Sequence, residues 1–305
     1  MPYAVTVVLS LILAFAIDWE QLAAALRQAT LPFFLLALLL SFINLPVGAE
    51  RWRILLRRLD IRVPLWQTCR YVLEANAVNI FIPGGLAGDL ARGFHMKQWC
   101  GSGANAFSSV ITDRLMGLAG FLFFVPIAIL LRSEQLAQGV LLIPLLICTV
   151  CLVLGCAVLY SRRLSSMVLR LARCIPPLFR ALEKLFCSLQ AYRHAEGILM
   201  RAFLVTQAGH FLFISSAYCI NLSLGLGIDF LSFFLYIPII TILSAIPISH
   251  AGLGLRETGF VLFFSLAGIA KEPALAMSLL FFAAVGVIPG VFGLFSLAVR
   301  RVQAR

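Results

Sequence analysis

The stretch NIFIPGGLAGDLARGF (residues 79–94) decides how this chain is arranged, because it interrupts a strongly apolar region with glycines, a proline, an aspartate and an arginine. Proline and glycine disturb regular helices, and charged side chains are costly to place in a lipid bilayer. The stretch is therefore either a polar turn between membrane spans or a polar site held inside the membrane.

The composition is that of an integral membrane protein. The chain has 305 residues, of which 62% are hydrophobic and 12% charged, and its mean hydropathy is +1.01; a soluble domain carries about 25% charged residues. No polar block is long enough for a separate soluble domain, so we expect one membrane domain over residues 1–305. The net charge of +11 comes from short basic segments between apolar runs, which is typical of cytoplasmic loops rather than of nucleic-acid binding.

Six apolar runs approach the roughly 20 residues that are needed to cross a bilayer. They lie at residues 2–17, 31–50, 105–131, 139–160, 199–224 and 273–299. The first is interpreted as an uncleaved span because it lacks the basic start of a signal peptide; a leader cleaved near residues 14–16 is the alternative. Two more apolar segments, 65–97 and 229–270, are interrupted by proline and glycine.

Basic residues orient these spans. Arginine and lysine are concentrated at residues 51–62, at 162–201 and at the C-terminal end, and the positive-inside rule assigns all three places, and both termini, to the cytoplasm. The segments 65–97 and 229–270 must then enter and leave the membrane on one side each, from opposite faces. We therefore predict an all-α polytopic membrane protein with six full transmembrane helices and two oppositely oriented re-entrant helical hairpins, arranged like an inverted repeat.

The predicted halves are residues 1–160 and 199–305, and a basic amphipathic linker at 162–198 connects them. We expect this linker, and the other basic cytoplasmic loops, to contact anionic lipid headgroups. The expected location is a bacterial cytoplasmic (inner) membrane.

The tips of the two hairpins match each other. Arg92 follows Pro83 by nine residues, and Arg256 follows Pro247 by nine residues. Glycines lie between them, and an acid lies near each arginine. The other tip residues are Gly84, Gly85, Gly88 and Asp89 in the first hairpin, and Ser249, His250, Gly252, Gly254 and Glu257 in the second. Because helix N-termini and arginines both attract anions, the tips are predicted to bind an anionic substrate.

Charges at the tips require partners if the tips lie deep. An arginine or aspartate at the bilayer centre costs about 2.5–3.5 kcal/mol on insertion scales. We expect the tip charges to pair with each other across the two hairpins, or with Asp113 and Arg114 of the 105–131 span. Arg256 and Glu257 are not expected to pair, because adjacent residues on a helix do not face each other. The alternative is that both tips are interfacial loops with their charges in headgroup water.

Other polar residues in apolar segments extend this interpretation. Arg70 and Glu74 are spaced to pair on one helix face, and His210 is expected to make an interhelical hydrogen bond. His95 is predicted to contact headgroups and Arg51 to anchor the end of a span at the interface. The C-x-x-C at residues 148–151 has no histidine or acid nearby, so we expect neither a metal nor a cofactor.

Three elements together resemble the lysylphosphatidylglycerol synthase transmembrane region, a flippase-like membrane domain family. The family element P-G-G-x-G-G-D-x-x-R is matched at residues 83–92, with Ala87 where a glycine is usual; its D-R is Asp113-Arg114; its late P-x-S-x-x-G-x-G-x-R-E is matched at 247–257. The resemblance covers essentially the whole chain and implies movement of anionic or aminoacylated lipids, or of lipid-linked intermediates, between leaflets. The bifunctional members carry a soluble aminoacyl-transferase domain after this region. This sequence has none, so we expect a stand-alone member that does not itself make lysylphosphatidylglycerol.

The predicted function is a lipid flippase or transporter rather than an enzyme. Arg92 and Arg256 would hold the headgroup, with backbone donors from the glycines and with Ser249 and His250 beside them. Charge partners or proton relays would be Glu74, Asp89, Asp113, Arg114 and Glu257. No nucleotide-binding motif is visible, so transport would be passive or ion-coupled. Alternatives are an intramembrane enzyme acting on a lipid-linked phosphate or sugar, and an accessory subunit of a lipid synthase; a homo-oligomer or a separate lipid-modifying enzyme are further expected partners.

Overall fold

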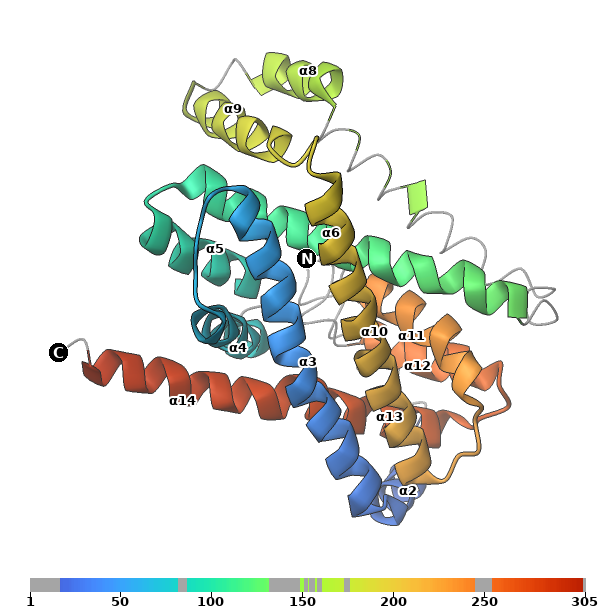
Figure 1. Cartoon of the computed structure of the whole chain (residues 1–305). Helices are drawn as coiled ribbons and strands as arrows, with labels where there is room; N and C mark the ends of the chain where they lie inside the picture. The colour runs from blue at the N-terminus through green and yellow to red at the C-terminus, as the bar shows by residue number, and fades with distance from the viewer. Residues whose placement is uncertain are drawn as a thin grey trace.

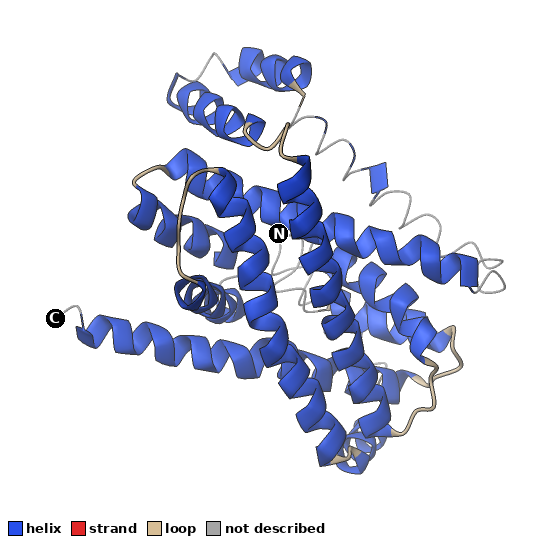
Figure 2. Cartoon of the chain, in the orientation of Figure 1, coloured by secondary structure: helices blue, strands red, loops and turns tan. Residues whose placement is uncertain are grey.

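The computed structural model describes residues 17–81, 87–131, 161–172, 176–244 and 254–303, together with residues 149, 150, 153 and 157. Every regular element within these ranges is a helix, as Figure 2 shows. The predicted all-α class is therefore confirmed for this part of the chain.

The helices follow one another with short connections. Their bounds are α2 Trp19–Gln28, α3 Leu31–Arg58, α4 Leu65–Phe81, α5 Ala87–Cys100, α6 Gly103–Leu131, α8 Arg162–Ala172, α9 Pro176–Gln190, α10 Glu196–Leu224, α11 Phe230–Ser244, α12 Leu255–Ser265, α13 Lys271–Phe282, the π-helix η2 Ala283–Val287, and α14 Ile288–Gln303.

Four helical stretches in the described residues are long and apolar enough to cross a membrane: Leu31–Arg58, Gly103–Phe124, Glu196–Leu224 and Lys271–Val299. They coincide with four of the predicted spans. The other two predicted spans, 2–17 and 139–160, lie almost wholly outside the described residues, so the count of six stays a prediction. One boundary is corrected: the basic stretch after residue 50 is not a loop, because α3 continues through it to Arg58.

Each predicted hairpin is a pair of packed helices. α4 packs against α5 in the first, and α11 packs against α12 in the second. The predicted apices, including Gly84, Gly85, Ser249, His250 and Gly252, fall in the stretches 82–86 and 245–253, which are outside the described residues. Re-entry of both hairpins from opposite faces remains a prediction.

The two halves of the chain are interlocked (Figure 1). α3 packs along α10, α4 packs against the terminal helix α14, and α11 packs against α6. In each hairpin the second arm packs against the helix that follows it in the chain: α5 packs against α6, and α12 packs against α13. If α3 corresponds to α10, α4 to α11, α5 to α12, and α6 to the consecutive helices α13, η2 and α14, each of these contacts in one half has a counterpart in the other. This is the packing expected of an internal repeat.

The apolar core is divided unequally between these halves. A large cluster rich in phenylalanine joins α10 to α13, with Phe233, Phe260 and Phe264 fully buried. A smaller cluster around Trp52 and Met96 joins α3, α4, α5 and α6. The smaller cluster lies beside the charged residues of the first hairpin.

Candidate functional site

The first hairpin places Asp89 and Arg92 in the opening turns of α5. The side-chain oxygen of Asn79, on α4, accepts a hydrogen bond of 2.7 Å from the Gly88 N–H, so α4 satisfies a backbone donor at the start of α5. A Cβ atom on Gly88 would overlap the Ala75 carbonyl oxygen and the Asn79 side chain. Glycine therefore permits the close approach of the two arms, and the helix N-terminus favours the negative charge of Asp89.

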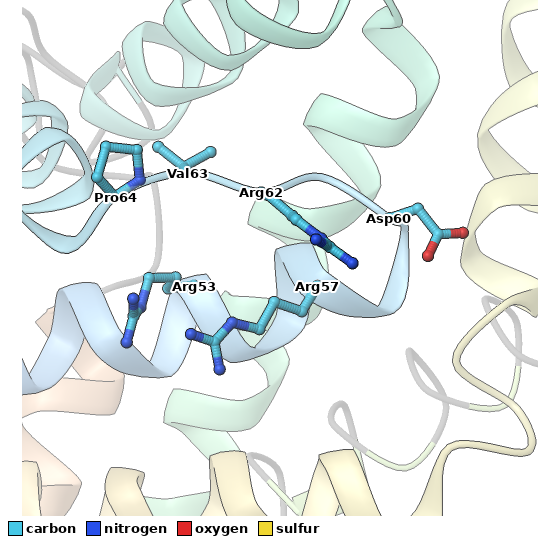
Figure 3. A pocket seen from close by; sticks show the side chains of 6 residues that line it. All are labelled: Arg53, Arg57, Asp60, Arg62, Val63 and Pro64. Carbon is cyan, nitrogen blue, oxygen red and sulfur yellow. The ribbon is translucent and has the colours of Figure 1, made fainter.

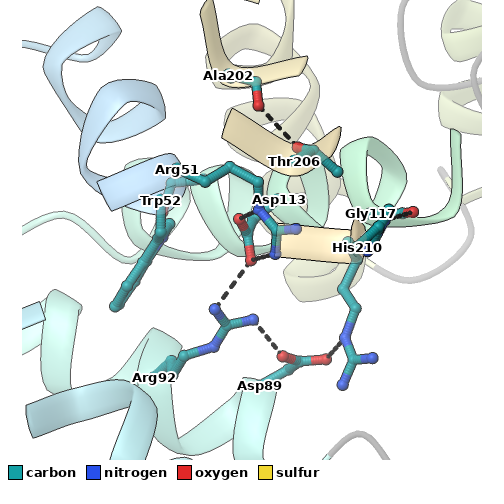
Figure 4. Close-up of polar contacts among 11 residues, drawn as sticks. Arg51, Trp52, Asp89, Arg92, Asp113, Gly117, Ala202, Thr206 and His210 are labelled. Atoms are coloured by element: carbon teal, nitrogen blue, oxygen red, sulfur yellow. Dashed lines mark hydrogen bonds and ion pairs between the residues drawn. The ribbon is translucent and has the colours of Figure 1, made fainter. Parts of the chain in front are cut away.

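Five charged side chains form a continuous charge network (Arg51, Asp89, Arg92, Asp113 and Arg114) across α3, α5 and α6. Figure 4 shows the contacts. Arg92 donates to Asp89 at 2.5 Å and to Asp113 at 2.9 Å, and Arg51 donates to Asp113 through Nε at 2.6 Å and Nη2 at 3.1 Å. Arg114 donates to the second Asp89 oxygen. Two carboxylates thus hold three guanidinium groups together.

The network is graded from buried to accessible. The side chain of Asp113 is 1% exposed and that of Arg92 is 9% exposed, whereas that of Arg114 is 42% exposed. The guanidinium of Arg92 also lies 5.0 Å from the Trp52 ring centroid, a favourable cation–π arrangement. The Arg92 guanidinium is therefore held by two carboxylates and an aromatic ring. Arg114 has the most exposed side chain of the three network arginines.

The predicted pairing with Asp113 and Arg114 is confirmed for the first tip, whose Arg92 and Asp89 bind them, and is wrong for Arg256 of the second tip, which binds Glu257. The alternative, that Arg92 and Arg256 have partners in the opposite hairpin, receives no support from the ion pairs of the described residues. The sequence interpretation missed Arg51, which is not an interface anchor: it lies inside α3 and binds Asp113. No local signal marks this role, since its partner lies 62 residues away.

Two adjoining cavities lie against the network. One, of about 240 Å³, is lined by network side chains together with Asn76 and Asn79. The other, of about 350 Å³, is lined by Ser41, Asn44 and Thr206 and by apolar side chains from α3, α10 and α14. Arg51 and Arg114 line both cavities. Together they form a space that is polar and cationic at one end and mixed polar and apolar at the other.

His210 lies at the wall between these cavities. Its Nε2 is 2.8 Å from the Gly117 carbonyl oxygen, and its ring stacks on Phe121 with centroids 3.6 Å apart. The predicted interhelical hydrogen bond is therefore confirmed, between α10 and α6. This contact joins the two halves of the chain directly beside the charge network.

A second buried cluster surrounds Glu74 on α4. Arg70 donates to Glu74 at 2.9 Å, as predicted, and Ser296 of α14 donates at 3.1 Å. His95 of α5 also lies 3.1 Å from Glu74. The prediction that His95 contacts headgroups is thus wrong: its partner is an acid in the neighbouring arm, because α5 packs against α4.

The second hairpin has a simpler charge arrangement. Arg256 donates to the adjacent Glu257 and, at 3.4 Å, to Ser278 of α13, and its guanidinium lies 3.9 Å from the Phe282 ring centroid. The prediction that Arg256 and Glu257 do not pair is wrong. At the first turn of a helix Glu257 folds back, where it accepts from the Gly254 N–H at 2.6 Å, and this turn brings its other oxygen to the arginine.

Comparisons with known proteins identify the family to which this chain is similar. Residues 3–293 match the family described as lysylphosphatidylglycerol synthase TM region. The chain is also similar to a UPF0104 membrane protein of Pyrococcus horikoshii, with 25% identity in an alignment 301 positions long that covers 90% of this chain and 89% of that protein. Among the described residues, the match covers both hairpins and three of the four membrane-length apolar helices in full, and it extends to residue 293 of the fourth, Lys271–Val299. The chain is an integral membrane protein that belongs to the lysylphosphatidylglycerol synthase transmembrane-region family.

Proposed function

We propose that this chain moves a lipid with an anionic headgroup between membrane leaflets, and that the charge network holds the headgroup. The observation that supports this proposal is the charge balance. Three guanidinium groups share two carboxylates, and each guanidinium lies within salt-bridge distance of at least one of them, so the five side chains carry one excess positive charge beside a cavity. An excess positive charge that is partly removed from water is stabilised by a nearby negative charge, so an anion in the cavity would neutralise the network.

The charge balance also favours one class of headgroup. A phosphodiester carries a single negative charge, which neutralises the network. A lysyl ester of phosphatidylglycerol adds two ammonium groups and is cationic, so the same cavity would repel it. We therefore infer a preference for phosphatidylglycerol-like or other phosphodiester lipids over aminoacylated lipids.

Arg114 is the residue that we assign to direct headgroup contact. It has one carboxylate partner among the network residues, its side chain is partly exposed, and it lines both cavities. A phosphate could replace Asp89 as its partner with little loss, because guanidinium groups bind phosphate and carboxylate in the same bidentate geometry. Arg92 would supply charge and hold Asp89 and Asp113 in place.

Arg256 and the second tip would serve the opposite leaflet in the same proposal. The Arg256–Glu257 pair is neutral and buried, so this tip would contribute backbone donors and positioning more than net charge. Relative movement of the interlocked halves, with the π-helix η2 beside the larger cavity, would open the site to one leaflet and then the other. In this proposal both termini lie in the cytoplasm, as inferred from the basic segments. Transport involves no enzymatic step.

Lipid movement in reconstituted vesicles tests the proposal. Phosphatidylcholine vesicles carrying the protein and a trace of fluorescent phosphatidylglycerol, phosphatidylethanolamine or lysylphosphatidylglycerol are treated with an impermeant quencher, and the rate at which inner-leaflet label becomes accessible is measured. We expect phosphatidylglycerol to move fastest. Arg114→Gln should slow it by at least about tenfold, since a hydrogen bond to a charged group contributes about 1.5–3 kcal/mol.

Two control variants sharpen the result. Arg114→Lys keeps the charge and loses the planar fork, so it should fall between wild type and Arg114→Gln. Arg27→Gln removes one exposed charge from α2, which precedes the start of α3, whereas Arg51 lies near the end of that helix, and it should leave the rate unchanged. Wild-type rates equal to those of empty vesicles for every lipid would reject translocation itself; unchanged rates for Arg114→Gln would reject the assigned site.

A further inference from the structure

A third, separate cavity lies where α3 ends and α4 begins. It has a volume of about 620 Å³ and is lined by Arg53, Arg57, Asp60 and Arg62, with Val63 and Pro64 at its edge. Figure 3 shows three arginine side chains from the end of α3 and from the following loop around this hollow. Arg53 and Arg57 are one helical turn apart on one face of α3, whereas Arg51 lies on a different face. The cavity is therefore distinct from the one beside the charge network.

The chain reverses at this point through a specific turn. Asp60 has a left-handed backbone (φ 59°), its N–H donates to Arg57, and the Ile61 N–H donates to Leu56. These two bonds form the Schellman motif that commonly ends helices, and Ile61 and Leu56 are both buried in the same apolar cluster. The turn fixes the direction of the loop, which returns Arg62 to the arginine-bearing face of α3.

The positive charge in this hollow is only partly balanced. Arg53 pairs with Glu50 at 2.5 Å. Among the described residues, no ion pair joins Arg57 or Arg62 to an acid, and both residues are exposed. Asp60 is the single carboxylate lining the hollow. Two guanidinium groups from different segments thus converge on an open space of a size that admits a phosphate and its ester groups.

Two exposed tryptophans place this hollow at the level of lipid headgroups. Trp66 follows the lining residue Pro64 by two positions and is 65% exposed. Trp99, at the end of α5, is 46% exposed, and its indole N–H donates to the Arg62 carbonyl oxygen at 3.4 Å. Exposed tryptophan is characteristic of the membrane–water interface. Their position beside Arg57 and Arg62, which have no acidic partner in the described part of the chain, indicates a lipid ligand rather than a soluble anion.

We propose that this hollow is a second phosphate-binding site, which holds the headgroup of a lipid from the leaflet on the side of the α3–α4 loop. Arg57 and Arg62 would contact the phosphate oxygens, and Trp66 and Trp99 would lie against the glycerol and upper acyl region. A phosphomonoester such as phosphatidic acid, with more negative charge than a phosphodiester, would bind best. The proposal goes beyond translocation and does not depend on it.

Lipid binding to the full chain in neutral detergent micelles tests the site. Soluble dioctanoyl phosphatidic acid, dioctanoyl phosphatidylcholine and inorganic phosphate are titrated separately, and bound ligand is measured by native mass spectrometry and calorimetry. We expect Arg57→Gln/Arg62→Gln to weaken phosphatidic acid binding at least tenfold. Asp60→Gly removes the single acid and suits the left-handed backbone, so it should strengthen binding severalfold.

The matched control removes the same charge elsewhere. Arg27→Gln/Lys271→Gln takes two exposed basic side chains from α2 and α13, outside the basic segments that are expected to contact lipid headgroups, and should leave the affinity within twofold of wild type. An equal loss in this control would overturn the site in favour of general charge attraction. Inorganic phosphate binding as tightly as phosphatidic acid would overturn the lipid assignment. Because the readout is binding, failure here and failure of lipid movement through the central cavity give separate results.

Discussion

Replacing Asp113 with asparagine tests the charge network most directly. The Asp113 side chain is 1% exposed and accepts three hydrogen bonds, two from Arg51 and one from Arg92. Asp113→Asn keeps the shape, removes the charge and replaces one acceptor oxygen by a donor that points at a guanidinium. Removing one partner of a buried ion pair typically costs 3–5 kcal/mol.

The structure places the expected value at the lower end of that range. Arg92 keeps Asp89 as a partner, and Arg51, whose side chain is 18% exposed, can turn toward the adjoining cavity. We therefore expect Asp113→Asn to lower the free energy of unfolding by about 3 kcal/mol. Glu50→Gln is the control, because its pair with Arg53 is partly exposed on both sides and such pairs contribute about 0–1 kcal/mol.

Unfolding by titration of a denaturing detergent into mixed micelles measures both variants. A double variant, Asp113→Asn/Arg51→Gln, restores the single excess positive charge of the network and should recover part of the loss, with a coupling free energy of about 1–3 kcal/mol. If Asp113→Asn costs no more than Glu50→Gln, or if the double variant is simply additive, the residues do not act as a network and the reasoning is refuted.

Three further predictions concern the elements that support the site. Gly88→Ala should lower the free energy of unfolding by about 1–3 kcal/mol, because its Cβ would overlap α4; Gly48→Ala, where a Cβ meets nothing within 4 Å, should be neutral or stabilising in the same detergent titration. Gly293→Ala should also destabilise by about 1–3 kcal/mol, since its Cβ would overlap the Leu73 carbonyl on α4; thermal unfolding equal to wild type would contradict the packing of α14 on that helix. Asp18 caps α2, and the hydrogen bond from the Gln21 N–H holds the pKa of its carboxyl below the usual value. The stability that the ionised cap contributes is therefore present at neutral pH and is lost as pH falls through the folded-state pKa. The difference in thermal stability between wild type and Asp18→Ala should shrink below about pH 4, and a constant difference down to about pH 3 would exclude an ionic cap.

The parts of the site that were predicted correctly depend on energetic necessity. Arg92 and Asp113 had to find partners in an apolar setting, and the sequence offers few candidates, so their pairing followed from cost. The long apolar runs likewise located four helices, although α3 continues to Arg58, beyond its predicted end at residue 50. The all-α class followed from the same requirement, because a helix satisfies its own backbone hydrogen bonds in lipid.

The parts that were missed depend on contacts without a local signal. Arg51 is predicted to anchor the end of a span because basic residues after an apolar run usually mark the interface, yet α3 continues to Arg58. His95 and Glu74 lie in different arms, and only the packing of α5 on α4 brings them together. Glu257 lies in the first turn of α12, where its side chain folds back to accept from the Gly254 N–H and also contacts Arg256. The rule that adjacent side chains do not face each other applies to helix interiors.

The interlocked packing has a consequence for how the chain can be inserted during synthesis. All five residues of the charge network lie on α3, α5 and α6, so a nascent chain can neutralise most of its costly charges as soon as α6 has left the ribosome. The outer support of α4 comes from α14, whose Ser296 binds Glu74 and which is translated last. The first hairpin therefore lacks part of its packing, the contact of α4 with α14, until α14 has been translated and inserted. Truncations after α13 should leave a protein that enters the membrane but is degraded there.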